Sequence, residues 1–267
     1  MIAALRYEWR RLTTLRSTWW LTAIGAVVTL GLALLIALAI ASAGEVSEGD
    51  NYQLGAVATQ GAAVGGVPLL VAYLFALLGV FCFGHEYRHG MIRATLTAVP
   101  SRGAVFAAKV LVTAAAAFLV GAVITLLGAG IALLVLSAID GEGGTALELA
   151  LGVGTYTALF ALVGLALASL FRNQIASLVV VLVMPTVVEA VIQAVLVFPP
   201  AFDDVQFLAR YLPFDAGSQL YVQLSPNDAL DLLGYDPLGA VGGGLVFAGF
   251  TALLLAAAGV LFVRRDA

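Results

Sequence analysis

The chain has 267 residues, of which 62% are hydrophobic and 10% are charged, against roughly 25% charged residues in an ordinary soluble domain. A water-soluble fold could not cover so much apolar surface, so the composition excludes a soluble globular protein and predicts an integral membrane protein. The formal net charge is −4 and there is one cysteine, Cys82, which excludes an internal disulfide.

The N-terminal residues, 1–18, predict an amphipathic helix at the membrane surface. Ile2, Leu5, Trp9 and Leu12 recur at spacings of three and four, with arginines between them, a pattern typical of an interfacial helix. The alternative is a plain basic flank of the first span. The apolar run that follows is far longer than the 7–15 residues of a signal-peptide core, so we expect it to be retained.

Six apolar segments are long enough to cross a bilayer as helices, which takes about 20 residues each. These predicted spans are residues 19–43, 62–83, 105–138, 147–170, 175–198 and 238–263. Only four residues separate the fourth span from the fifth, and Arg172 with Asn173 is too costly to leave in hydrocarbon, so we expect a short turn there. The sequence thus predicts one all-α transmembrane domain over residues 1–267.

The charges predict the orientation of these spans. With the N-terminus in the cytoplasm, eleven of the twelve basic residues fall on the inner side and only Arg210 falls outside, in agreement with the positive-inside rule. We therefore expect a multi-pass protein of the cell inner (plasma) membrane with both termini in the cytoplasm. Residues 84–104 then form a cytoplasmic loop, and residues 199–237 form an acidic extracellular segment.

Three residues inside the predicted spans are candidates for a part in translocation. Glu189 lies in the fifth span, four residues after Pro185, and an ionisable group at that depth is a functional candidate by default. The structural alternative is that Glu189 bonds a backbone group that Pro185 leaves without its helical partner. Pro68 is expected to kink the second span in the same way.

The extracellular segment 199–237 is rich in apolar side chains, and Pro213 and Pro226 divide it into pieces of helical length. Backbone that enters a membrane without spanning it must be covered by protein. The pattern predicts helices that pack on, or dip into, the outer leaflet. The alternative is a folded cap with no role in transport.

Residues 85–89, His-Glu-Tyr-Arg-His, match the zinc motif H-E-x-x-H, in which two histidines bind the metal and the glutamate is a general base. Catalytic zinc usually takes three protein ligands, and the sequence has only these two histidines; the carboxylate available within a span is Glu189. An intramembrane zinc metalloprotease using His85, Glu86 and His89 is therefore the alternative function. The sequence has no phosphate-binding loop and no nucleophile elbow.

The stretch 86–109 resembles the cytoplasmic loop of ABC-2-type transporter permeases, the membrane subunits of bacterial ABC exporters. Met91 stands where the family usually has threonine. Further similarities are the turn at 171–173, the pair Pro185 and Glu189, the outer-loop residues 211–213 and the basic end at 262–266. The matching positions of the loop are Glu86, Tyr87, Gly90, Arg93, Leu96, Ser101, Arg102 and Lys109.

The resemblance implies an ABC-2 fold with an N-terminal interfacial helix, a cytoplasmic coupling helix between spans 2 and 3, and re-entrant extracellular helices between spans 5 and 6. It also implies an extracellular gate in the outer segment, at Tyr211, Leu212, Pro213 and Phe214. The residues expected to couple to the ATPase are Glu86, Tyr87, Arg88, His89, Gly90, Met91, Ile92, Arg93 and Leu96.

The resulting functional prediction is the permease subunit of an ATP-driven exporter that moves an amphipathic, lipid-like or antibiotic-type substrate outward by alternating access. The expected partners are two copies of an ABC ATP-binding subunit, a second permease copy as in a homodimer, and the lipid bilayer, with no nucleic acid. We expect neither catalytic residues, metal nor cofactor on this chain, since ATP and Mg would be bound by the partner. A membrane scaffold or a secondary transporter is the third possibility, but no internal repeat favours it.

Overall fold

The computed structural model of the chain describes residues 2–42, 70–88, 90–92, 97, 101–136, 143–197, 200–222 and 236–264. Every regular element in these ranges is a helix. Six helical runs among them are long and apolar enough to cross a membrane, which agrees with the predicted number. They are α2 (Arg16–Ser42), α4 (Leu70–Arg88), α6 (Arg102–Val135), α7 (Gly143–Phe171), the run Gln174–Val197, and α12 (Gly239–Arg264).

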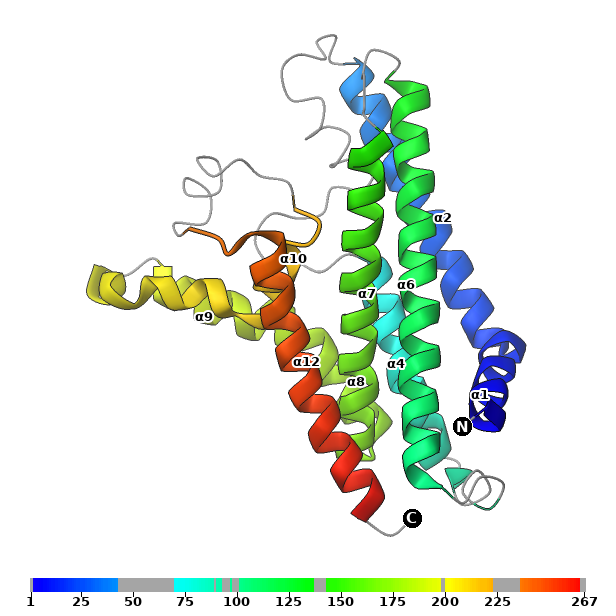
Figure 1. Cartoon of the computed structure of the whole chain (residues 1–267). Coiled ribbons are helices and arrows are strands. Elements are labelled where there is room, and N and C mark those ends of the chain that lie inside the picture. Colours follow the sequence, from blue (N-terminus) through cyan, green and yellow to red (C-terminus); the bar gives the residue numbers. More distant parts are fainter. Residues whose placement is uncertain are drawn as a thin grey trace.

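Helices α4 and α7 form the centre of the bundle (Figure 1). The most apolar stretch of α7 is 83% buried and that of α4 is 61% buried, against 22–33% in the other four runs. Glycines allow this pair to approach closely, because a Cβ at Gly79 would collide with the carbonyl of Ala161, and one at Gly164 with the carbonyl of Ala76. Small residues permit such backbone contact between membrane helices.

Helix α6 has 34 residues, so at ~1.5 Å per residue it is ~50 Å long and must tilt or project beyond the ~30 Å hydrocarbon layer. It begins at Arg102, where the Ser101 side chain accepts a hydrogen bond from the Ala104 amide, as an N-cap residue does. Helix α4 continues to Arg88, five residues beyond the predicted end of the second span. Residues 62–69, including Pro68, lie outside the described part of the chain.

The turn between α7 and α8 (Gln174–Val183) is short. Arg172 takes a left-handed conformation with φ 51°, and the Asn173 side chain caps α8 by accepting from the amides of Ile175 and Ala176. The Arg172 guanidinium lies 5.6 Å from the centre of the Tyr87 ring. This turn therefore lies beside the end of α4, at the end of the bundle where α1 and the end of α12 are also found (Figure 1).

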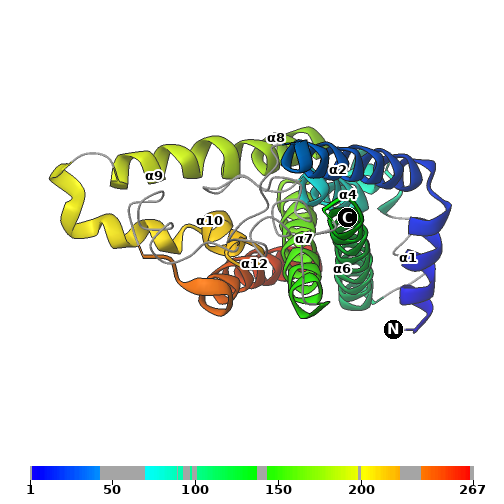
Figure 2. The ribbon, with the colours of Figure 1, turned by 90° about the horizontal axis from the view of Figure 1, so that it is seen from above.

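The fifth spanning run is not one regular helix. α8 is followed by the π-helix η1 (Met184–Val188) and then by α9 (Glu189–Val197). Pro185 is the physical cause, because it cannot donate to the α-helical ladder and a wider turn accommodates it. Seen from above, the run leaves the bundle, and η2 (Pro200–Tyr211) returns beside α9 to α10 (Pro213–Ser218), which packs on α12 (Figure 2).

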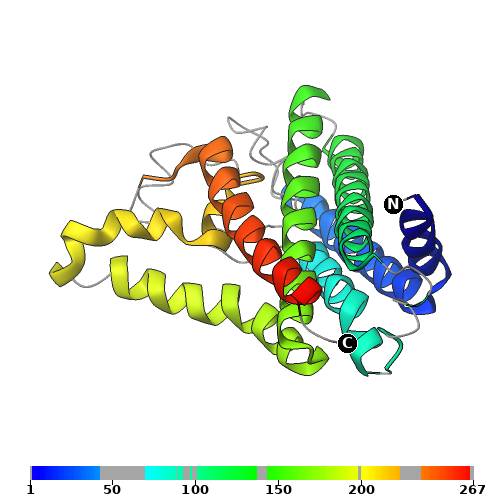
Figure 3. The same cartoon turned by 60° about the horizontal axis from the view of Figure 1, so that its bottom comes forward.

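Helix α1 (Ile2–Thr14) is separated from α2 by one residue and packs on α6, on the side of the bundle opposite α12 (Figures 2 and 3). The exposure of α1 does not follow a simple division into one buried apolar face and one exposed polar face. Ile2 and Trp9 are 74% and 48% exposed, whereas Ala4 and Glu8 are buried. Ile2 and Trp9 of the apolar stripe thus face outward, Leu5 and Leu12 are half-buried, and the face with Ala4 and Glu8 is turned to the protein.

Candidate functional site

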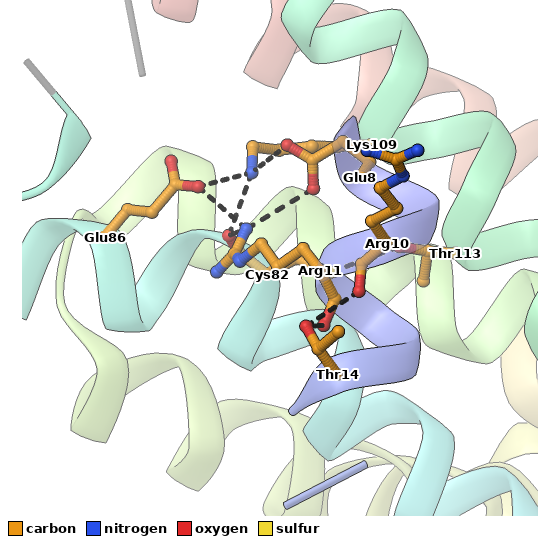
Figure 4. Close-up of polar contacts among 8 residues, drawn as sticks. All are labelled: Glu8, Arg10, Arg11, Thr14, Cys82, Glu86, Lys109 and Thr113. Atoms are coloured by element: carbon orange, nitrogen blue, oxygen red, sulfur yellow. Dashed lines mark hydrogen bonds and ion pairs between the residues drawn. The ribbon is translucent and has the colours of Figure 1, made fainter. Parts of the chain in front are cut away.

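Four charged side chains from three helices meet at the α1 end of the bundle (Figure 4). Glu8 and Arg11 come from α1, Glu86 from the last turn of α4, and Lys109 from the second turn of α6. We call these four residues the charge cluster. Two acids and two bases make it electrically balanced.

Lys109 and Glu86 are the centre of this charge cluster. The Lys109 Nζ lies 2.7 Å from Oε1 of Glu86 and 2.8 Å from Oε1 of Glu8. The Arg11 Nη1 lies 2.7 Å from the same Glu86 oxygen and 3.4 Å from Oε2 of Glu8. One carboxylate oxygen of α4 therefore joins α1 to α6.

The backbone of α4 adds a third anchor for both cations. The carbonyl oxygen of Cys82 accepts from Arg11 Nη1 at 3.0 Å and from Lys109 Nζ at 3.3 Å. The Cys82 sulfur lies 3.2 Å from the hydroxyl of Thr113 on α6. Charged and polar groups on three helices thus pair with one another, as buried charge requires, although Oε2 of Glu86 is buried without a hydrogen-bond partner.

The charge cluster is secluded from solvent. Lys109 is fully buried, and Glu86 and Glu8 are 2% and 3% exposed. Burial alone would lower the pKa of Arg11, but the negative charge of Glu86, with smaller effects of Cys82, Glu8 and Tyr7, raises that pKa above its ordinary value. The guanidinium therefore remains charged. Removing one partner from a buried pair typically costs ~3–5 kcal/mol.

A second buried acid lies in the fifth spanning run. Glu189 is 3% exposed, and its two carboxylate oxygens accept from the amides of Phe214 and Asp215, each at 3.0 Å. These amides belong to the first turn of α10, which has no intrahelical acceptors for them. The partners of Glu189 are therefore in α10 and not beside Pro185, where the structural alternative from the sequence placed them.

Aromatic rings hold α10 against the bundle. The Phe214 ring packs 5.2 Å from those of Phe160 on α7 and Phe247 on α12. Tyr156 of α7 lies 5.0 Å from Tyr221, just beyond α10, and burial raises the pKa of Tyr221. The segment after the fifth spanning run is therefore joined to three others through one carboxylate and one aromatic cluster.

The structure separates the predicted coupling residues into two kinds. Glu86 and Ile92 are buried, at 2% and 5% exposure, while Arg88, Gly90 and Met91 are exposed and Tyr87 is half-buried. His89, Arg93 and Leu96 lie outside the described residues. The exposed members could touch a partner, whereas Glu86 can act on one only through its neighbours.

The predicted gate residues also differ in burial. Tyr211 is 44% exposed, Phe214 is buried at 1%, and Leu212 and Pro213 are intermediate. Leu212 precedes α10 as its N-cap, and Pro213 is its first residue, a position that suits proline because it needs no donor.

Sequence reasoning missed the charge cluster. The rule that singled out Glu189, an ionisable residue inside a predicted span, applies equally to Lys109 in the span predicted at 105–138. A partner for Lys109 could have been sought among Glu8 and Glu86, the acids nearest to the ends of neighbouring spans. The contact of Arg11 with the Cys82 carbonyl leaves no signal in the sequence.

The zinc motif gains no support from the geometry. The His85 ring stacks on Phe81 at 4.7 Å, and in the described part of the chain no three His, Cys, Asp or Glu residues are grouped so as to hold a metal ion. Glu86, the residue expected as general base, is instead paired with Lys109 and Arg11.

A protein-family model described as "ABC-2 family transporter protein" matches residues 5–188 of the chain. The match begins in α1, ends with η1 and includes all four residues of the charge cluster. No curated protein matches the sequence.

Proposed function

This chain belongs to the ABC-2 transporter family, and from that premise we propose that it is the permease subunit of an ATP-driven exporter whose ATP-binding subunit is a separate chain. Family membership and six apolar helices make it a multi-pass membrane permease subunit. The outward direction, the cargo class, the partner copies and the residues that couple them are the content of the proposal.

The observation that carries the proposal is the ion pair between Glu86 and Lys109. Glu86 lies near the end of α4 and Lys109 near the start of α6, so their 2.7 Å contact joins the two helices on either side of the loop 89–101. Arg11 adds α1 to the same unit. A force on this loop would move three helices together, as coupling to an ATPase requires.

Within this proposal, the two ends of the chain and loop 84–104 are cytoplasmic, and the ATP-binding subunit docks on the exposed residues next to the charge cluster. Arg88 and Met91 supply exposed contacts in the described part of the loop, and His89 and Arg93 would extend them. ATP and Mg would be bound by the partner alone. Two ATP-binding subunits and a second permease copy would complete the exporter.

The segment from η2 to α10 is the proposed extracellular gate. Glu189 links it to the Pro185 π-helix, which is where the fifth spanning run departs from α-helical geometry. A change in the angle of that run would pull on α10 through two hydrogen bonds. The proposed cargo is amphipathic or lipid-like, because the spans offer mainly Ala, Val, Leu and Gly surfaces.

Charge reversal at the docking surface tests the proposal. We expect Arg88→Glu to weaken binding of the purified ATP-binding subunit by about tenfold or more, since an unfavourable charge at an interface costs at least ~1.4 kcal/mol. ATP-driven transport in proteoliposomes should fall in parallel. Arg264→Glu is the matched control, because Arg264 is also exposed and ends α12 at the same end of the bundle. Equal binding by the two variants would refute docking at this loop.

A further inference from the structure

A cavity of about 270 Å³ lies between α1, α2, α4 and α6, next to the charge cluster. Cys82 and Thr113, whose side chains contact each other, form its wall on the side of the charge cluster. The cavity is well above the ~150 Å³ that suffices for an apolar cavity to bind benzene. No residue of the charge cluster lines it, so it is separate from the ion pairs.

The lining of this cavity is chiefly apolar. Thr13 donates to the carbonyls of its own helix and Thr113 contacts Cys82, whereas the hydroxyl of Thr18, which also lines the cavity, is buried without a hydrogen-bond partner. The polar surface of the lining is therefore limited to a few hydroxyls. The apolar lining includes Trp9, Trp19, Phe75, Leu78, Leu119 and Ala116.

The cavity opens toward the lipid-facing surface. Trp9, Trp19 and Leu119 are 48%, 61% and 52% exposed, although each also lines the cavity. Indole rings favour the boundary between hydrocarbon and headgroups. A lipid acyl chain that entered the cavity beside Trp9 and Trp19 would come from the leaflet at the α1 end of the bundle.

The exposed arginines of α1 lie beside this opening. Arg6 precedes Trp9 by three residues and Thr13 by seven, which places all three on one face of the helix, and Arg10, four residues after Arg6, is also exposed. In the described part of the chain neither arginine has an ion pair. Their charge complements a phosphate and not a second apolar helix.

We propose that the cavity holds one acyl chain of an anionic phospholipid, whose headgroup phosphate is bound by Arg6 and Arg10. The lipid is a resident of the leaflet at the α1 end and not the cargo. By filling the space between α1 and the bundle it supports the position of the charge cluster. The proposal depends on the cavity and the arginines alone and holds whether or not the chain exports anything.

Quenching of Trp9 fluorescence by brominated lipid tests the site. The reporter carries Trp19→Phe and Trp20→Phe, which leaves Trp9 as the one tryptophan of the chain, and is reconstituted in vesicles with increasing fractions of dibromo-phosphatidylglycerol. Ala116→Phe fills the cavity, and Ala115→Phe is the control, because Ala115 is the exposed neighbour that does not line it. Half-maximal quenching should need about tenfold more brominated lipid in Ala116→Phe, since losing the burial of two methylenes weakens binding by roughly that factor.

A second comparison does not depend on how well Ala116→Phe folds. In the reporter, dibromo-phosphatidylglycerol should quench at a lower fraction than dibromo-phosphatidylcholine, and Arg6→Gln with Arg10→Gln should abolish this preference. Coincident curves for Ala116→Phe and Ala115→Phe would overturn the acyl-chain site. An unchanged headgroup preference in the arginine variant, or the same cavity-dependent quenching by free dibromostearate alone, would overturn the assignment to an anionic phospholipid.

Discussion

Two buried acids, Glu86 and Glu189, are central at the scale of single residues, and they hold the two proposed working parts of the molecule. Glu86 pairs with cations of α1 and α6, and Glu189 pairs with amides of α10. Both would be prohibitively costly if left alone in an apolar bundle. Their partners lie 23 to 75 residues away along the chain, so each joins distant segments.

Lys109→Met tests whether the stability of the protein depends on the charge balance of the charge cluster. It leaves Glu8 and Glu86 to share Arg11, so we expect the free energy of unfolding to fall by about 3–5 kcal/mol, measured by chemical denaturation in detergent micelles. Adding Glu8→Met removes the surplus charge while the 2.7 Å pair of Arg11 and Glu86 remains. The double variant should therefore be more stable than Lys109→Met. Additive losses would contradict the balance that we describe.

Glu189→Gln should loosen the start of α10. A glutamine has one acceptor oxygen, so one of the two amides, Phe214 or Asp215, loses its partner at a cost of ~1–3 kcal/mol. Hydrogen exchange of these two amides should accelerate, whereas exchange in α6 should not. Glu148→Gln is the control, because Glu148 is an exposed acid of α7. Unchanged protection of residues 214 and 215 would show that the carboxylate does not hold α10.

At the scale of elements, the number of spanning helices could be predicted from the sequence because hydropathy and length decide it. The end of α4 could not. Residues 84–88 contain His85, Glu86 and Arg88, which by themselves end an apolar run, yet the helix continues because Glu86 finds cations on α1 and α6. A partner on another helix depends on the tertiary structure, which a local sequence pattern does not predict.

The segment predicted at 199–237 shows the same limit. Pro213 correctly divides it, since α10 begins there, and Pro185 marks the π-helix. The sequence also identified Glu189 as costly. It could not show that the acid accepts from α10, because the geometry depends on the return of η2 beside α9. The roles of His89, Arg93 and Pro68 remain predictions, since these residues lie outside the described part of the chain.

Helices α4 and α7 pack so closely that no side chain fits at Gly79. Gly79→Val would drive a side chain into the backbone of Ala161, and such overpacking typically costs ~1–3 kcal/mol. We expect Gly79→Val to have a lower melting temperature in detergent than the unchanged protein. We also expect less of the variant to elute in the folded peak on size-exclusion chromatography. Gly31→Val on α2 is the control, because a Cβ at Gly31 meets no atom within 4 Å. Equal melting temperatures would mean that the two helices do not pack this closely.

In the whole molecule, the buried charged groups are gathered in two separate regions of an apolar bundle. The end with α1 carries the charge cluster and the proposed docking loop, whereas Glu189 and α10 lie beside the middle of α7, where Phe214 packs on Phe160. The central α4–α7 pair connects them, because both helices are buried along most of their length. Such a division suits a permease subunit, in which events at a partner must reach a distant gate.

In the proposed function, this chain is the membrane subunit of an exporter driven by a separate ATP-binding subunit. Native mass spectrometry of the tagged chain, purified from the membranes of its own cells, tests it most directly. We expect a complex with two copies of this chain and two copies of a protein that carries a phosphate-binding loop for ATP. A chain that is recovered intact, monodisperse and without any ATP-binding subunit would contradict it.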